Sequence, residues 1–406
     1  MPKREGKAAR APDGAEAAAP VFLPSLGYLR AFVVVMVVVH HAVLAYIPGL
    51  PAVSHVFLGG LRLWRAFPVI DREHWALAGP IMTFNDAYFM SLMFLLSGLF
   101  VCQSIERKGV AVFVRDRMMR LGIPFLFTAL IISPAAYAFA WLQSGGALDL
   151  LRYASAWIGM GDWPTGPAWF VLALLVFDMA AAALIAAAPN ATVWLGALVA
   201  AGKQKPVSLV LRVCALSLLV YAPLALIFGP DHWTDWGPVQ FQTARILHYF
   251  LYFLVGVGLG ANGLSRGLLA TDGLLAKRWA LWLVAMVVGW LIGAVVFFGL
   301  AGSPIRLYPF LLLFVVNCAL RCFAFLALFT RFAKRRNPVC DSLTANSYGI
   351  YLVHYVFVAA IQYALLTAPL PGSAKAGMVV AGALATSWLV AMGLRRLPVA
   401  AKLLGE

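Results

Sequence analysis

The sequence has 406 residues, of which 63% are hydrophobic and only 12% are charged, whereas soluble domains are about 45–50% apolar and about 25% charged. This composition excludes an ordinary soluble domain and predicts an all-α, polytopic integral membrane protein. The formal net charge of +15 would suggest nucleic-acid binding in a soluble protein. In a membrane protein, cytoplasmic loops collect Lys and Arg, so no nucleic-acid partner is expected.

Ten apolar segments are long enough to cross the hydrocarbon core of a bilayer, which needs about 20 helical residues. In chain order they are 26–47, 83–103, 119–142, 167–188, 207–228, 243–263, 279–299, 307–330, 346–368 and 377–394. The segment before them, residues 1–22, is rich in Ala, Pro and charged residues and is predicted to be a disordered tail. Residues 23–396 then form one membrane domain, and residues 397–406 form a short second tail.

Basic residues are unevenly distributed over the loops between these segments. With the N-terminus inside, the inner segments hold about three times as many Lys and Arg residues as the outer ones, as the positive-inside rule predicts. Both termini are therefore expected in the cytoplasm. The Ala-rich, Arg-containing chain suggests a bacterial inner membrane. Cys318 and Cys322 lie four residues apart without further ligands evident nearby, so no metal site is predicted.

The first apolar segment contains the stretch RAFVVVMVVVHH, in which ionisable side chains stand at both ends of an apolar run. His41 follows Arg30 by eleven residues, which is about 16 Å along a helix and within about 20° of the same direction. His40 points about 100° away from His41. Ionisable side chains inside a span are costly and usually functional. The pattern indicates a functional stripe; a snorkelling arginine and hydrogen-bonded histidines are the structural alternative.

The sequence of Arg, ten residues and His resembles the signature of the membrane-bound acyltransferase-3 family. Four further stretches resemble the family's Phe-rich second span, its basic loop with a proline, its Trp-Phe-Leu helix and its Tyr-Leu-x-His span. They are YFMSLMFLLSGLFV at 88–101, FVRDRMMRLGIPFLF at 113–127, GPAWFVLALLVF at 166–177 and SYGIYLVHYVFV at 347–358. The resemblance runs from about residue 26 to residue 394, which is nearly the whole chain.

Membership of this family implies transfer of an acyl group, often acetyl or succinyl, from a cytoplasmic acyl-CoA. The acceptor is usually a hydroxyl of a carbohydrate or of a lipid-linked group at the outer face. Acyl-CoA is a substrate here, and no bound cofactor is expected. The chain ends soon after the last predicted span, so the hydrolase-like domain that some members carry is not expected.

Transfer from a thioester to a hydroxyl needs a base, because a hydroxyl is a poor nucleophile near neutral pH. A buried imidazole suits this role, and His41 is the candidate, with His40 as a neighbouring contact to substrate. Asp86, at about the depth of His41, and His354, in the ninth segment, are candidate catalytic partners. Tyr351 is expected in the same cavity as His354, with structural hydrogen bonds as the alternative for both residues.

The basic loop before the third segment is the candidate site for the anionic donor. Arg side chains bind phosphate in a bidentate fork, and this loop holds Arg115, Arg117 and Arg120. Arg30 is expected to position the donor or to anchor its helix. Plain positive-inside topology is the alternative explanation of the loop.

Three further residues are candidate substrate contacts. Ser97 shares a helix face with Asp86 and is expected either to hydrogen-bond in the donor channel or to allow close packing beside Gly98. His248, near the outer face, is a candidate for the acceptor end. Trp169 belongs to the Trp-containing outer stretches GDWPTGPAWF and GPDHWTDWGPVQFQ. Their rings form either an interfacial belt or a platform on which a sugar ring or another acceptor stacks.

Two other classes of protein compete with an acyltransferase. A transporter or exporter also places ionisable residues in mid-membrane, but it favours two similar halves with paired broken helices, and no such repeat is evident. In a non-catalytic structural subunit, the register of Arg30 with His41 would be accidental.

Overall fold

The computed structural model describes residues 24–51, 53, 68–161, 163–264, 267–300 and 302–404. Within these ranges the chain is mainly helical, and its strands form a single two-stranded sheet. The fold is therefore the all-α, multi-span architecture that the composition predicts. The disordered tail expected at residues 1–22 lies outside the described residues, whereas the second tail holds a short helix, α18 (Pro398–Leu404).

The first half of the chain runs through α1 (Pro24–Leu44), α2 (Ala78–Asp86), α3 (Phe89–Gly98), α4 (Val101–Lys108), α5 (Val110–Arg117), α6 (Ile123–Phe127), α7 (Ser133–Gln143), α8 (Leu150–Gly159), α9 (Trp169–Ala187) and α10 (Ala191–Ala200). The second half comprises α11 (Pro206–Phe228), β1 (Trp233–Trp236), β2 (Val239–Gln242), α12 (Ile246–Ala261), α13 (Leu274–Lys277), α14 (Trp279–Gly299), α15 (Leu307–Phe332), α16 (Pro338–Ala364), α17 (Gly372–Leu394) and α18.

Eight helical stretches of the described chain are long and apolar enough to cross a membrane. They are Pro24–Leu44, Ala78–Lys108, Val110–Gln143, Gly166–Ala187, Pro206–Phe228, Trp279–Gly299, Leu307–Phe332 and Gly372–Leu394. The other two predicted segments are also helical, as α12 and α16. α12 is shorter than the predicted segment because the helix begins only after β2 and Arg245. α16 is long enough to cross a membrane, but polar residues such as His354 and Gln362 interrupt its apolar run.

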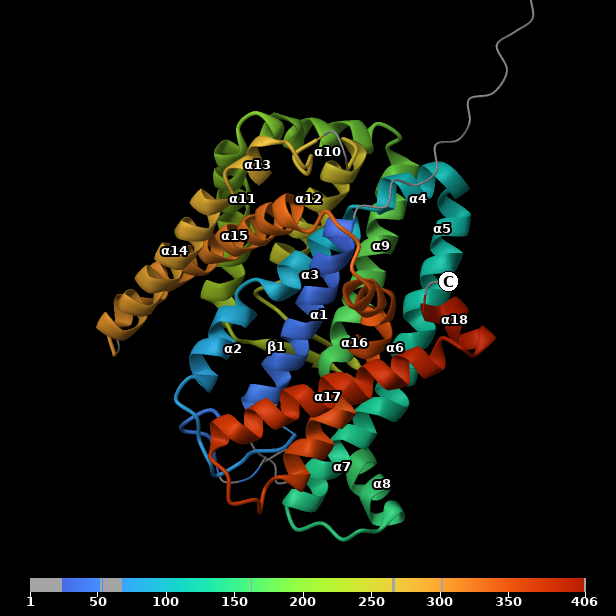
Figure 1. The fold of residues 1–406 in the computed structure, drawn as a ribbon, viewed down its shortest axis with the longest axis vertical. Coiled ribbons are helices and arrows are strands. Elements are labelled where there is room, and N and C mark those ends of the chain that lie inside the picture. Colours follow the sequence, from blue (N-terminus) through green and yellow to red (C-terminus); the bar gives the residue numbers. More distant parts are fainter. Residues whose placement is uncertain are drawn as a thin grey trace, which may run out of the picture.

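α1 lies in the middle of the helices, where it packs against α16, α2, α15, α17 and α3 (Figure 1). Its apolar side chains Val33, Val37 and Val38 are at most 1% exposed. A helix that is apolar on all sides is buried by its neighbours on all sides. At the histidine end of the opening stretch, His40 is buried and His41 is half-buried, whereas Arg30 at the other end is exposed.

The third span is one long helix with two π-helical turns, at Met118–Gly122 and Thr128–Ile132. Each turn is followed by a helix that has a proline in its first two positions, Pro124 in α6 and Pro134 in α7. Proline lacks the N–H for the usual helical hydrogen bond, and its ring clashes with the preceding turn. A wider turn before each proline relieves that clash and keeps the span continuous.

α3 and α12 approach each other closely through glycines. A Cβ atom at Gly256 would meet the carbonyl oxygen of Leu95, one at Gly260 would meet that of Leu99, and one at Gly98 would meet that of Phe253. Small residues allow membrane helices to pack backbone against backbone. The Ser-Gly end of α3 therefore has a clear packing role.

Candidate active site

A cavity of about 140 Å³ lies beside the C-terminal end of α1. The sequence predicts that this end, the outer end of α1, lies on the outer side of the membrane. Its wall comes from α1, α2, α3, α7, α9, α16 and the β1–β2 hairpin, so segments from most of the chain converge on it. Five of the candidate residues line this cavity: His40, His41, Asp86, Trp169 and Tyr351.

His41 lies in a cluster of aromatic rings within the cavity wall. Its ring centroid is 5.3 Å from that of His354 and 5.1 Å from that of Tyr355, both on α16. The ring of His40 turns away to pack 5.0 Å from that of Phe89 on α3. The two neighbouring histidines therefore face different helices, as the helical period predicts.

His354 is fully buried and stands next to His41 without forming part of the cavity wall. Its Nδ1 lies 2.7 Å from the carbonyl oxygen of Tyr351. A carbonyl only accepts, so Nδ1 donates, and Nε2 of the neutral ring is an acceptor. Among the described residues, neither this Nε2 nor Nδ1 of His41 has a hydrogen-bond partner. Two imidazoles with unused nitrogens therefore lie side by side.

Asp86 lines the cavity from α2, but its carboxylate forms an ion pair with an arginine. Nη1 of Arg245 donates to Oδ2 of Asp86 over 2.6 Å, and the Arg245 side chain is 3% exposed. Nη2 of Arg245 lies 3.6 Å from Asp231, and the guanidinium lies over the ring of Phe314. Within the described chain no hydrogen bond joins Asp86 to His41, so the neighbour of the candidate base is His354.

The other end of α1, the inner end, carries Arg30. Arg30 is exposed although Leu29 and Ala31 beside it are buried, and its Nη2 donates to the carbonyl oxygen of Thr344 over 3.5 Å. The half-buried Ser97 donates to the carbonyl oxygen of Met93 in its own helix over 2.8 Å.

The basic residues of the third span differ in their surroundings. Nε of Arg117 lies 3.1 Å from Asp178, whose side chain is 1% exposed, so this pair joins α5 to α9. Arg115 has a side chain that is 75% exposed and lies 3.8 Å from Asp116. The backbone carbonyl of Arg120 accepts a hydrogen bond from Tyr348 of α16 over 2.8 Å. Arg117 is thus partly neutralised, and Arg115 is the most available cation of the three.

The remaining candidates divide between the cavity and the core. Tyr351 lines the cavity and donates its hydroxyl hydrogen to the carbonyl oxygen of Pro167. The ring of Trp169 meets that of Trp233 edge to face, with centroids 5.7 Å apart. His248 is fully buried among aromatic rings, including Tyr221 and Tyr252, away from the cavity wall.

The outer end of α1 is fastened by groups from distant helices. Nε2 of Gln362 on α16 donates to the carbonyl oxygens of His41 and Ala42, each over 3.1 Å. The backbone N–H of Asp71 donates to the carbonyl oxygen of Ala45, and that of Trp75 donates to Tyr46. Helix ends leave carbonyl groups without intrahelical partners, and these contacts satisfy them.

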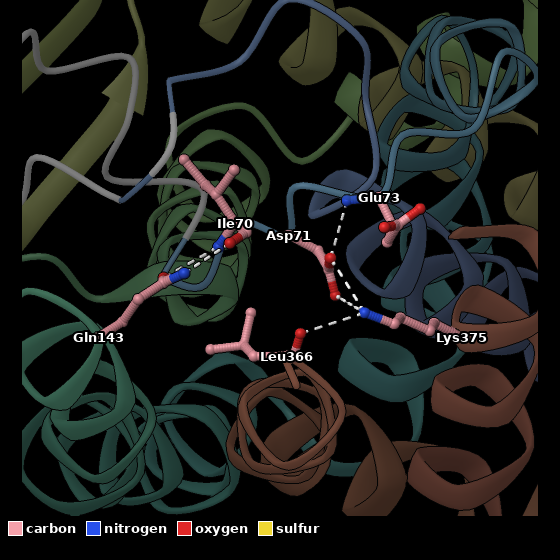
Figure 2. Close-up of polar contacts among 6 residues, drawn as sticks. All are labelled: Ile70, Asp71, Glu73, Gln143, Leu366 and Lys375. Carbon is pink, nitrogen blue, oxygen red and sulfur yellow. Dashed lines mark hydrogen bonds and ion pairs between the residues drawn. The ribbon is translucent and has the colours of Figure 1, made fainter. Parts of the chain in front are cut away.

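The loop that supplies two of these contacts is itself held by a buried ion pair (Figure 2). Nζ of Lys375 on α17 lies 2.9 and 3.1 Å from the two carboxylate oxygens of Asp71 and 3.3 Å from the carbonyl oxygen of Leu366. The side chains of Lys375 and Asp71 are 0% and 3% exposed. Gln143 of α7 bonds both the N–H and the carbonyl of Ile70.

Sequence reasoning missed Arg245, Gln362 and Lys375 as parts of this site. Each of the three is a polar residue inside or directly beside a predicted apolar segment, and this pattern could have marked them as candidates. Across the described residues, no group of three or more His, Cys, Asp or Glu side chains is arranged to hold a metal ion.

These features define a multi-pass membrane protein with a histidine-lined cavity at one end of its central helix. The chain belongs to the acyltransferase-3 family: residues 23–392 match the family's acyltransferase domain, which is nearly the whole sequence. No curated protein and no solved structure matches the chain. The protein is therefore a membrane acyltransferase, and a transporter is not favoured.

Proposed function

We propose that the protein moves an acyl group, acetyl or succinyl, from cytoplasmic acyl-CoA to a hydroxyl of a carbohydrate or lipid-linked acceptor at the outer face of a bacterial inner membrane. The observation that carries this proposal is the position of His41 in the wall of the outer cavity, on the same helix as Arg30. Acyl-CoA carries its thioester on a long flexible arm, so its phosphates can bind at the inner end while the thioester reaches His41.

In the proposed reaction His41 acts as the general base. It takes the proton of the acceptor hydroxyl while the oxygen attacks the thioester carbonyl carbon. The carbon–sulfur bond then breaks, and coenzyme A leaves as a thiol with the proton that His41 took. The carbonyl of Tyr351 fixes the tautomer of His354, and the ring of His354, 5.3 Å from that of His41, would orient the base by packing against it.

The cations at the inner end would bind the phosphates of the donor. Arg115 and Arg120 are the main candidates, since Arg117 already pairs with Asp178. We expect Arg115→Gln with Arg120→Gln to weaken the apparent affinity for acyl-CoA by at least about tenfold, because a hydrogen bond to a charged group contributes about 1.5–3 kcal/mol. Initial transfer rates at increasing acyl-CoA concentration measure this effect.

Arg152→Gln is the matched control for Arg115 and Arg120, which lie in the helical third span and not in the loop that the sequence predicts. Its side chain is 75% exposed, as that of Arg115 is, and it also lies beside an aspartate, but it belongs to the predicted outer face. The control should retain the wild-type affinity. An unchanged affinity in the inserted double variant would mean that Arg115 and Arg120 serve membrane topology alone.

The function itself is tested by incubating membranes that contain the protein with acetyl-CoA or succinyl-CoA labelled in the acyl group. We expect label in the glycan or lipid fraction, and none in membranes that carry His41→Ala. Uptake of label into vesicles without transfer to any acceptor would favour transport and contradict the proposal.

A further inference from the structure

The β1–β2 hairpin places four side chains of one face in the cavity wall. Residues directly opposite each other in an antiparallel pair lie on the same face, and the register pairs Trp233 with Gln242 and Asp235 with Gln240. These four residues are the hairpin residues that line the cavity. The alternate residue Trp236 lies on the other face and is 70% exposed.

The two glutamine amides of this face are oriented by hydrogen bonds to the protein. Oε1 of Gln240 accepts from the N–H of Thr165 over 3.1 Å, and Oε1 of Gln242 accepts from the hydroxyl of Tyr249 over 3.1 Å. Since both carbonyl groups are engaged, the amide nitrogens are the groups left to the cavity. The hydrogen bonds of both side chains within the described residues run through Oε1, and the two residues are 9% and 8% exposed.

We propose that this inward face recognises the ring of the acceptor and decides acceptor specificity. The N–H groups of Gln240 and Gln242 would donate to ring hydroxyl oxygens, the carboxylate of Asp235 would accept from a hydroxyl, and the indole of Trp233 would cover the C–H face of the ring. A simple aliphatic alcohol leaves the two amides unmatched, which disfavours its binding. A neutral pyranose has hydroxyl groups and a C–H face that match all four side chains. The role of this surface in acyl transfer rests on the proposed function.

The test uses purified full-length protein in lipid nanodiscs and a panel of methyl pyranosides with gluco, galacto, manno and N-acetylglucosamine rings. Glycerol is the polyol without a ring. Binding is followed by saturation-transfer NMR, and transfer by incorporation of labelled acetyl from acetyl-CoA. Gln242→Glu keeps an oxygen that accepts from the Tyr249 hydroxyl but removes the amide N–H donor. Trp233→Ala removes the indole ring of the inward face, and Trp236→Ala is the matched control on the outward face.

We expect wild type and Trp236→Ala to bind at least one pyranoside and not glycerol. Trp233→Ala and Gln242→Glu should each weaken that binding by about tenfold, which corresponds to about 1.4 kcal/mol, with the KM for acetyl-CoA unchanged. The inference fails if no pyranoside binds the wild type, or if the inward variants bind as Trp236→Ala does. Pyranosides that bind as expected but receive no label would contradict the proposed function and leave the recognition surface intact.

Discussion

His41→Ala is expected to lower acyl transfer by about 10²–10⁴-fold, because a positioned base contributes about that much to the rate. His41→Gln should be no better, since an amide can hold a hydrogen bond but cannot take the proton of a hydroxyl. The measurement is the initial rate of transfer of labelled acyl groups, normalised to folded protein in the membrane.

His40→Ala is the internal control for this loss, because it removes an imidazole from the same helix and cavity. The ring of His40 packs on Phe89, and His40 points about 100° away from His41 around the helix axis. Its loss should therefore act through packing and have a milder effect on transfer. An active His41→Ala beside an inactive His40→Ala would reverse the assignment and make His40 the base.

Lys375→Met is expected to lower the free energy of unfolding by about 3–5 kcal/mol, because it leaves the carboxylate of Asp71 buried without its cation. The double variant Lys375→Met with Asp71→Leu should recover most of this loss, since replacing both members of a buried pair by apolar side chains is often neutral. Unfolding in detergent micelles, followed by tryptophan fluorescence, gives the comparison.

Lys402→Met is the control for the loss of a lysine, since its side chain is exposed on α18. It should unfold as the wild type does. If Lys375→Met also unfolds as the wild type does, the buried pair contributes nothing to stability, and the loop before α2 is held by its backbone contacts alone.

The helices could be predicted because the length of an apolar run directly reports a membrane span. The register of Arg30 with His41 also follows from the helical period alone. The π-helical turns near Pro124 and Pro134 and the β1–β2 hairpin depend on local backbone geometry that hydropathy does not encode. The segment expected at 243–263 was too long because the apolar pattern does not distinguish the end of the hairpin from the start of α12.

Pairings between distant helices could not be predicted from one sequence. Asp86 lies close to the depth of His41, which made it a natural partner for that ring, but Arg245 from 159 residues away takes its carboxylate. Lys375 stands two residues before the last predicted segment and was assigned no role, although its side chain is buried against Asp71. Such contacts depend on how the helices pack, and a hydropathy pattern contains no information on that.

The carbonyl groups at the outer end of α1 have a consequence for how the two substrates meet. Gln362 binds those of His41 and Ala42, and the loop held by Lys375 binds that of Ala45, so α1 cannot slide or turn without breaking these bonds. A carrier that works by rocking one bundle against another needs such movement at its central helix. Under the proposed function, His41 would stay in place, and donor and acceptor would travel to it from opposite sides of the bilayer.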